Sequence, residues 1–159
     1  MSSTLVLGIG NRFRSDDAVG LLVAQKLQSL NLTEVEAHEL DQCCGLNLID
    51  LWKDAQSVVL VDAMCAGLPA GSVRRWEHSL SSSVPLLPLR SSHTLSIAYA
   101  ITLAQVLDQL PEHLVVYGIE GSSFLHGTEL SPGVSNQVRS VVRRISDECT
   151  ALREPTKSN

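Results

Sequence analysis

Short apolar runs rich in Val, Leu and Ile alternate along this chain with longer amphipathic segments, and this alternation is the strongest constraint on its fold. The run SVVLVDA at 57–63 is apolar almost throughout, as expected of a strand buried on both faces of a parallel sheet. TLVLGIG at 4–10 has the same character, and the apolar residues of AVGLLVAQKLQSL at 18–30 fall on one helical face. Because parallel strands need crossover segments between them, the pattern predicts an α/β fold.

The rest of the chain repeats these units. Further strands are expected at 35–40, 71–77 and 114–121, and further helices at 45–55, 91–110 and 130–145. The pattern predicts a single domain of the three-layer α/β/α class, with a twisted, mostly parallel sheet of about five strands and helices on both faces. A chain of 159 residues that is 44% hydrophobic can bury one sizeable core, so we assign the domain to residues 1–152 and expect 153–159 to be a frayed tail.

Composition argues against several classes of partner. The formal net charge is −5 and Lys and Arg form no basic stripe, so we expect neither nucleic acid nor an anionic membrane to bind. The longest apolar run, at 94–107, is too short to cross a bilayer, the first residues lack signal-peptide features, and the four cysteines lack zinc-site spacing. We therefore expect a cytoplasmic protein whose partner is a protein or a small molecule. With no heptad repeat present, we expect a monomer.

The segment GIGNRFRSDDAVG at 8–20 begins like a phosphate-binding glycine turn. The dinucleotide-binding fingerprint has a third glycine, for close helix–strand packing, where this chain has Phe13. Asp16 and Asp17 would stand at the start of the following helix, where carboxylates suit the helix dipole but repel a phosphate. A dinucleotide-binding oxidoreductase is therefore the less favoured alternative.

Three polar side chains are expected to converge at one edge of the sheet. Asp62 lies at the carboxyl end of the most apolar strand, where burial of a lone carboxylate is costly, and His93 stands at the entrance of a later helix. Open α/β sheets bind ligands at that edge, so Asp17, Asp62 and His93 form a candidate site for a divalent metal. Taken singly, Asp17 has a plainer explanation as an acidic residue in a first helical turn, and His93 has one as a packing histidine.

The ordered motifs GIGNRFRSDDAVG, VLVDAM, SSHTLS, LVVYGIEG and LSPGV together resemble the hydrogenase maturation protease family. Members of that family are endopeptidases that remove a C-terminal extension from the large subunit of nickel–iron hydrogenases. The resemblance spans nearly the whole chain, and GIEG with GTELSP is closer to the branch that serves soluble, bidirectional hydrogenases. It implies an aspartyl-type endopeptidase whose partner is the precursor of such a large subunit.

The resemblance also implies a role for each candidate residue. The metal-binding positions of the family fall on Asp17, Asp62 and His93, and Asp17 or Asp62 would also be catalytic by activating water. The nickel is the ion already inserted in the precursor, so no permanently bound cofactor is expected. Nickel accepts thiolate, imidazole and carboxylate ligands together, which makes a shared ion chemically reasonable. Asp16 would remain a helix-start carboxylate that orients its neighbour.

The chain departs from the family pattern after its second expected strand. Many members have an Asp followed by paired glycines there, whereas this chain has Asp41, Gln42 and Cys43, with the next glycine at Gly45. Paired glycines permit close approach of a substrate backbone, so we expect Asp41 and Gly45 to line the substrate-contact edge in altered form. The alternative for Asp41 is that it caps the following short helix.

An alternative from another functional class stays open. A non-enzymatic, nickel-sensing chaperone of the large subunit would use the same ligands without cutting. No Ser/His/Asp or Cys/His arrangement in the sequence identifies a nucleophile that would separate the two. The expected function is removal of the C-terminal extension after nickel insertion, with the chaperone as its main alternative.

Overall fold

The fold is seen in a computed structural model that describes residues 4–42, 45–79 and 94–152. Its sheet has five strands in the order β2-β1-β3-β5-β4, which are β1 (Thr4–Gly10), β2 (Val35–Asp41), β3 (Ser57–Met64), β4 (Val73–Ser79) and β5 (His113–Glu120). The helices are the 3-10 helix η1 (Ser15–Ala18), α1 (Val19–Ser29), α2 (Gly45–Trp52), α3 (Thr94–Val106) and α4 (Pro132–Ala151). The predicted strand and helix order is confirmed.

Within the described sheet, β1, β2, β3 and β5 run parallel and β4 opposes its neighbour β5. The link from β3 to β4, residues 65–72, contains no helix, so the chain turns back at the same end of the sheet. By contrast, α1 joins β1 to β2 and α2 joins β2 to β3 as crossovers. The predicted mostly parallel sheet is therefore confirmed, with one antiparallel edge strand.

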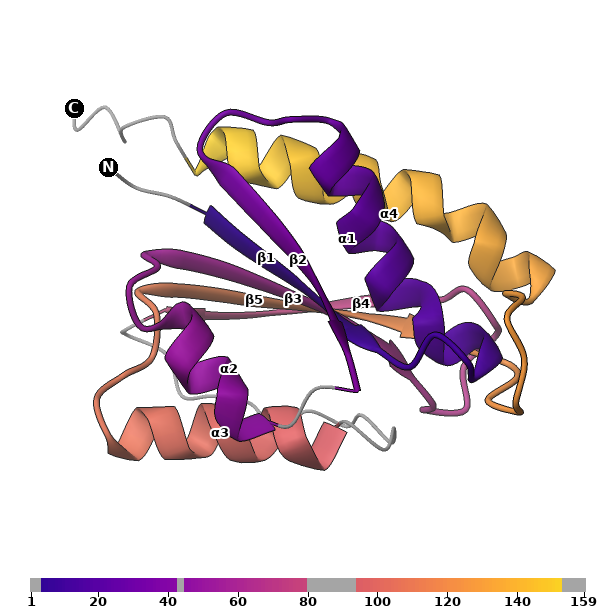
Figure 1. The fold of residues 1–159 in the computed structure, drawn as a ribbon, viewed down its shortest axis with the longest axis horizontal. Coiled ribbons are helices and arrows are strands. Elements are labelled where there is room, and N and C mark those ends of the chain that lie inside the picture. The colour runs from indigo at the N-terminus through magenta and orange to yellow at the C-terminus, as the bar shows by residue number, and fades with distance from the viewer. Residues whose placement is uncertain (1–3, 43–44, 80–93, 153–159) are drawn as a thin grey trace.

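Helices α1 and α4 cover one face of the sheet, and α2 and α3 cover the other (Figure 1). Successive buried residues of β3 alternate between the two cores. Leu60 belongs to the cluster with α2 and α3, and Val59 belongs to the cluster with α1 and α4. The strand predicted to be buried on both faces is buried on both, and the predicted three-layer arrangement is confirmed.

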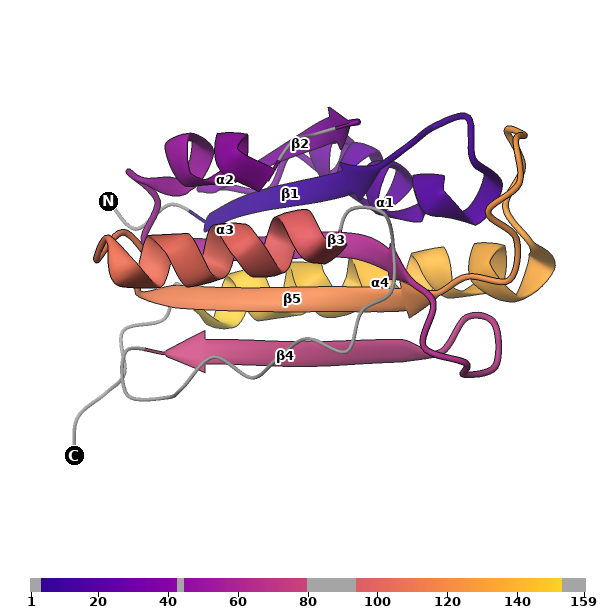
Figure 2. The same cartoon turned by 90° about the horizontal axis from the view of Figure 1, so that it is seen from below.

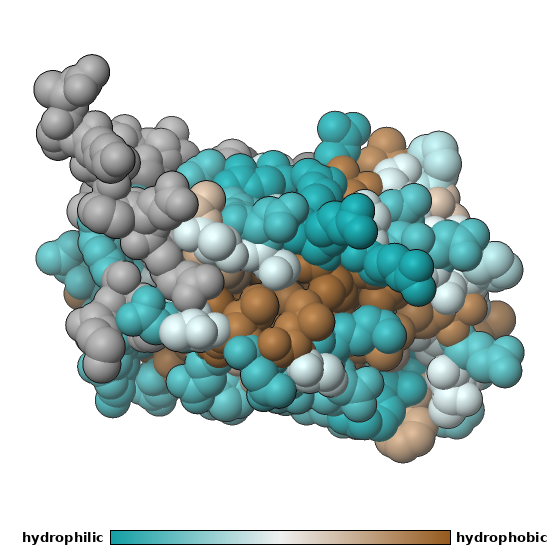
Figure 3. Space-filling view, turned by 90° about the horizontal axis from the view of Figure 1, so that it is seen from above, coloured by the Kyte–Doolittle hydropathy of each residue, from teal (hydrophilic) through white to brown (hydrophobic). Residues whose placement is uncertain are grey.

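Apolar side chains gather in the middle of the molecular face shown in Figure 3, with polar side chains around them. Helices α1 and α4 contact each other on that side, and partly buried apolar residues such as Leu22 and Val142 pack against the core there. Contiguous apolar surface of this kind can be covered by another chain. The expected monomeric state therefore stays a prediction.

Glycines seat α1 directly on the sheet. A Cβ at Gly8 would lie 2.1 Å from the carbonyl oxygen of Gly20, and a Cβ at Gly20 would lie 2.3 Å from the carbonyl oxygen of Val61. Both distances are far below van der Waals contact, so α1 reaches β1 and β3 because these positions lack side chains. Gly20 thus supplies the close helix–strand packing that the dinucleotide fingerprint obtains from its third glycine.

Several element ends differ by a few residues from the sequence expectation; α2 ends at Trp52 rather than near residue 55, and α4 continues to Ala151 rather than ending near residue 145. β3 continues past Asp62 to Met64, because β5 pairs with it as far as Glu120. α3 ends at Val106 rather than near residue 110. There Asp108 has a positive φ of 56° and the N–H of Gln109 donates to the carbonyl oxygen of Ala104 at 2.8 Å, which closes the helix.

Residues 153–159, expected to be a frayed tail, lie outside the described residues, so the domain boundary at residue 152 stays a prediction. Among the helices that the structure describes, none is long and apolar enough to cross a membrane.

The strand order reverses between β1 and β3, because β2 lies on one side of β1 and the later strands lie on the other. Open α/β sheets bind ligands at such a switch point, beyond the carboxyl ends of the strands. The β1–β3 ladder ends at Gly8 and Val61, although β1 continues to Gly10 beside β2 and β3 continues to Met64 beside β5. The two central strands therefore separate at this end of the sheet.

Candidate functional site

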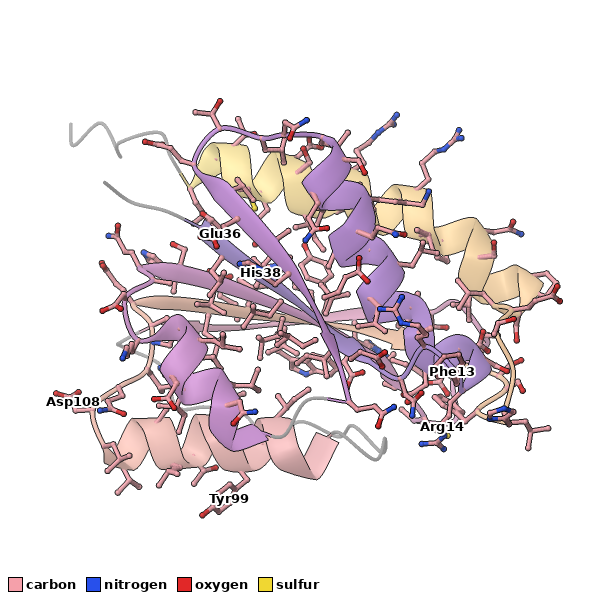
Figure 4. The ribbon with its side chains drawn as sticks, in the orientation of Figure 1. Phe13, Arg14, Glu36, His38, Tyr99 and Asp108 are labelled. Atoms are coloured by element: carbon pink, nitrogen blue, oxygen red, sulfur yellow. The ribbon has the colours of Figure 1, made fainter. Side chains whose placement is uncertain are left out.

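Asp17 lies in η1, immediately after the turn that follows β1, and its side chain is buried. The turn is closed by backbone hydrogen bonds from the N–H of Asn11 to the carbonyl oxygen of Asp17 (3.2 Å) and from the N–H of Asp17 to that of Arg14 (3.1 Å). Nη1 of Arg14 lies 3.9 Å from Oδ2 of Asp17. Figure 4 shows Phe13 and Arg14 beside η1, at the end of the molecule where β1 ends.

Asp62 is buried in β3, on the face covered by α2 and α3. It stands one residue beyond Val61, the last β3 residue that pairs with β1, and its Oδ1 accepts a hydrogen bond from the N–H of Ala63 at 2.8 Å. Because η1 contacts both β1 and β3, Asp17 and Asp62 belong to the same end of the sheet. The structure thus brings two of the three predicted metal-site residues to the switch point.

His93, the third predicted metal ligand, lies outside the described residues. The first described residue of α3 is Thr94, and α3 begins toward the end of the sheet where β3 and β5 end (Figure 2). The part of the chain that the structure describes contains no group of three His, Cys, Asp or Glu side chains able to hold a metal ion. The set of Asp17, Asp62 and His93 therefore stays a prediction.

The predicted substrate-contact residues lie one strand further out. Asp41 ends β2 beside Gly10, and its carboxylate accepts hydrogen bonds from the backbone N–H (3.2 Å) and Nε (3.0 Å) of Arg12. Gly45 begins α2. Among the described residues the Asp41 carboxylate thus pairs with Arg12, and the capping alternative stays open because residues 43–44, directly before α2, lie outside the described residues.

An open groove of about 500 Å³ runs between β2 and α2 on this side of the molecule. Its lining residues are mostly polar or acidic and are Glu39, Leu40, Asp41, Gln42, Asn47, Asp50 and Leu51. A groove of this volume beside the edge strand β2 has room for an extended segment of another chain. Contact of Asp41 and Gly45 with a substrate remains a prediction.

Asp16 has a larger role than the sequence suggested. Its buried carboxylate accepts four hydrogen bonds from the loop after β5: from the N–H groups of Ser122 (2.8 Å), Ser123 (2.9 Å) and Ser131 (2.7 Å), and from the hydroxyl of Ser131 (2.7 Å). Burial raises the pKa of Asp16, but these four donors outweigh it and hold the pKa below its ordinary value. The residue is therefore ionised at neutral pH and binds the loop after β5 to η1.

Backbone hydrogen bonds join the same two segments. The N–H of Ser15 donates to the carbonyl oxygen of Gly127 (2.9 Å), and the N–H of Gly127 donates to the carbonyl oxygen of Phe13 (2.8 Å). The N–H of Asp16 donates to the carbonyl oxygen of Ser123 (3.0 Å). Figures 1 and 2 both show the loops after β1 and β5 side by side. Together they form one wall beside the switch point.

Ser131 is the N-cap residue of α4, but its side chain makes no capping hydrogen bond to the helix. Its hydroxyl donates to Asp16 instead. No local pattern could show this, because the two residues are 115 positions apart in the chain. A serine before a helix-start proline is an ordinary capping signal, and tertiary structure overrides it here.

Glu120 fixes a second loop at this end of the sheet. Its buried carboxylate accepts hydrogen bonds from the backbone N–H groups of Ala66, Gly67 and Leu68, at 2.9 to 3.1 Å. Glu120 orders the link between β3 and β4.

The glycine turn, the paired carboxylates and the strand-end geometry fit one group of known proteins. A family model described as hydrogenase maturation protease matches residues 43–148, more than half of the chain. The chain belongs to the hydrogenase maturation protease family. Its class is therefore that of the peptidases, and family membership gives no support to the oxidoreductase alternative.

Similar proteins from several organisms agree with this assignment. The chain is 30% identical over 117 residues to the hydrogenase expression/formation protein HupD of Thiocapsa roseopersicina, covering 73% of this chain and 53% of that protein. It therefore spans about half the length of that relative. It is 27% identical over 145 residues to a putative hydrogenase maturation protease of Methanocaldococcus jannaschii, covering 87% of this chain and 88% of that protein.

Solved structures confirm the fold. The hydrogenase maturating endopeptidase HybD from E. coli superposes with a TM-score of 0.78 at 19% identity, covering 95% of this chain and 94% of that one. HybD from Thermococcus kodakarensis superposes with a TM-score of 0.72 at 22% identity, covering 92% and 99%. At these identities the likeness establishes the shared architecture.

Proposed function

We propose that this protein is an endopeptidase that removes the C-terminal extension of a nickel–iron hydrogenase large-subunit precursor after nickel insertion, and that it recognises the nickel held by the precursor. The observation that carries the proposal is the pair of buried carboxylates, Asp17 and Asp62, at the switch point of a chain from this family. Carboxylate oxygens are suitable ligands for a divalent ion, and two carboxylates at the strand ends would be in position to hold one.

In this proposal the nickel is part of the substrate. Asp17, Asp62 and His93 would occupy positions left open by the precursor's own thiolate ligands, and the protein would need no resident cofactor. Carboxylate oxygens and an imidazole nitrogen are suitable donors beside thiolates for a borderline metal. Binding to the shared ion would place the scissile bond next to the two aspartates.

Hydrolysis then requires an activated water. Asp17 or Asp62 would act as the general base, because both are carboxylates at the point where the peptide must lie. The groove beside β2 would hold the precursor segment, with Asp41 and Gly45 in contact with it. We place the activity in the cytoplasm and in residues 1–152.

Mass spectrometry of a large-subunit precursor incubated with the protein tests the proposal, with nickel-loaded and nickel-free precursor in parallel. We expect loss of a C-terminal peptide from the loaded precursor alone. Asp17→Asn and Asp62→Asn should each lower the cleavage rate at least about 100-fold, the scale of lost general-base catalysis. Asp54→Asn, a change at an exposed carboxylate between α2 and β3, is the matched control and should cleave normally.

Two outcomes would contradict the proposal in different ways. Binding of the loaded precursor without cleavage would favour the chaperone alternative. Equal cleavage of loaded and nickel-free precursor would leave the protein a peptidase but remove nickel recognition.

A further inference from the structure

We infer that Asp16 is a positioning residue, which anchors the loop after β5 to η1 and thereby fixes the orientation of the neighbouring Asp17 carboxylate for nickel. This inference rests on the proposed function and deepens it, because it assigns a second role within the acidic pair. Asp16 would act through Asp17 without touching the ion.

Every contact of the Asp16 carboxylate that the structure describes is directed into the loop. Oδ2 accepts from the N–H groups of Ser122 and Ser123 and from the hydroxyl of Ser131, and Oδ1 accepts from the N–H of Ser131. Both oxygens are thus occupied by donors, and the side chain is fully buried. A carboxylate held in this way is a structural anchor rather than a ligand for an incoming metal.

The two aspartates face different surroundings because they are consecutive in a 3-10 helix. Such a helix has three residues per turn, so neighbouring side chains point about 120° apart. Asp16 lies against the loop, where its Cβ is 3.0 Å from the position of a Cβ built on Gly121. Asp17 faces away from those donors, with Arg14 near its carboxylate. A rotation of η1 would move both side chains together.

The residue before Asp16, Ser15, has a strained backbone conformation and is hydrogen-bonded to the loop after β5. Ser15 has a φ of 51°, in the left-handed region that a serine adopts at a cost of about 1 kcal/mol. It is held there by hydrogen bonds on both sides, from its N–H to Gly127 (2.9 Å) and from its hydroxyl to Leu125 (2.9 Å). Loss of the Asp16 anchor would loosen the loop, release Ser15 and leave Asp17 without a fixed orientation.

An isosteric substitution of Asp16 tests the hydrogen bonds of its carboxylate without changing the volume of the side chain. Asp16→Asn keeps the size of the side chain but replaces one oxygen with an NH₂ group, which would face one of the four donors. Ser131→Ala removes one of the donors, whereas Ser131→Thr keeps the hydroxyl. Glu120→Gln is the matched control, because Glu120 is also a buried carboxylate that accepts backbone N–H groups, but from the loop at 66–68.

The test measures binding of nickel(II) to the purified protein by isothermal titration calorimetry, at a temperature where circular dichroism shows each variant to be folded. We expect Asp17→Asn to lose binding and Asp16→Asn to bind at least about ten-fold more weakly, the usual effect of removing a group that orients a metal ligand. Ser131→Ala should weaken binding and Ser131→Thr should restore it. Glu120→Gln should lower the melting temperature while keeping the wild-type nickel affinity.

Each result decides a separate point. If Asp17→Asn abolishes nickel binding and Asp16→Asn binds as tightly as the wild type, the positioning role is wrong. If Asp16→Asn does not fold, the two Ser131 variants decide the point. Equal nickel affinities of Ser131→Ala and Ser131→Thr overturn the inference, whereas a nickel affinity that falls only in Ser131→Ala supports it. A wild-type protein that binds no nickel by itself also overturns it, whereas the proposed function is decided independently by cleavage of the precursor.

Discussion

The phenol of Tyr117 in β5 donates a 2.6 Å hydrogen bond to Oε2 of Glu148 near the end of α4. Arg75 of β4 contacts the same carboxylate, with Nε 3.0 Å from Oε1, and the guanidinium of Arg144 lies 5.6 Å from the centre of the Tyr117 ring. One carboxylate thus connects the sheet, its antiparallel edge strand and the last helix, far from the acidic pair.

Alkaline pH should weaken this connection. Burial and the hydrogen bond to Glu148 raise the pKa of Tyr117 to about 12, from an ordinary value of 10.0. A raised pKa means that the contribution of Tyr117 to folding is complete below about pH 10 and is lost as the pH rises through about 12. Tyr117→Phe, which lacks the hydrogen bond to a charged acceptor, should cost about 1.5–3 kcal/mol of unfolding free energy at neutral pH.

The check is thermal unfolding of the wild-type protein and Tyr117→Phe, followed by circular dichroism between neutral pH and about pH 12. The difference between the two melting temperatures should shrink over the last two pH units as the wild-type phenol ionises. A difference that stays constant up to that pH would show that Tyr117 does not titrate as a buried donor.

A side chain at Gly20 should displace α1. Gly20→Ala places a Cβ about 2.3 Å from the carbonyl oxygen of Val61, so the helix must shift. We expect the free energy of unfolding to fall by about 1–3 kcal/mol or more, as in other cores into which extra atoms are forced. At Gly67 an added Cβ would have no atom within 4 Å, but φ is 80°. Gly67→Ala should therefore lower the free energy of unfolding by only about 1 kcal/mol, through backbone strain. Urea unfolding of both variants measures the difference, and equal losses would contradict close packing of α1 as the reason for Gly20.

The exposed pair of Arg12 and Asp41 should matter for substrate rather than for stability. Surface ion pairs contribute little to folding, so Asp41→Ala should leave the melting temperature within about 2 °C. If Asp41 contacts the precursor, the same variant should raise KM with kcat nearly unchanged, because the lost interaction would be equal in the ground and transition states. Steady-state cleavage of the loaded precursor measures both constants, and an unchanged KM would remove Asp41 from the contact surface.

The end of the chain should be dispensable. A truncated protein that stops at Leu152 keeps all of α4, including Glu148 and the buried Cys149. We expect its melting temperature and its cleavage rate to match those of the full chain. A lower rate with an unchanged melting temperature would instead assign residues 153–159 a part in precursor binding.

Most of the fold could be predicted because burial imposes periodicity. β3 has apolar residues on both of its faces, and α1 has them along one side only. Each element can therefore be recognised from its own stretch of sequence. The predicted end of α3 was wrong because Asp108 adopts a left-handed backbone conformation that stops the helix, and no glycine marks that position in the sequence. The continuation of β3 to Met64 depends on pairing with β5, which no local pattern reports.

The part of the site that could be predicted is the part placed by the ends of the parallel strands. Asp17 and Asp62 could be placed together because each follows or ends a parallel strand, and such ends meet at one edge. The contacts through which Asp16 would orient its neighbour could not be predicted, because the residues that donate to it are 106 to 115 positions away and reach it only through tertiary packing. A carboxylate in a first helical turn gives the same sequence signal whether it is exposed to water or enclosed by a distant loop.

The close backbone approach of α1 to β1 at Gly8 and Gly20 has a mechanical consequence for the end of the sheet beside η1. Side chains between a helix and a sheet can change rotamer and absorb a displacement, but no such layer separates α1 from β1 at this point. A displacement of the start of α1 relative to β1 or β3 must therefore be taken up by the backbone itself. In the proposed function, a metal ion held by Asp17 and Asp62 would therefore sit on a frame that side-chain repacking at Gly8 and Gly20 cannot adjust.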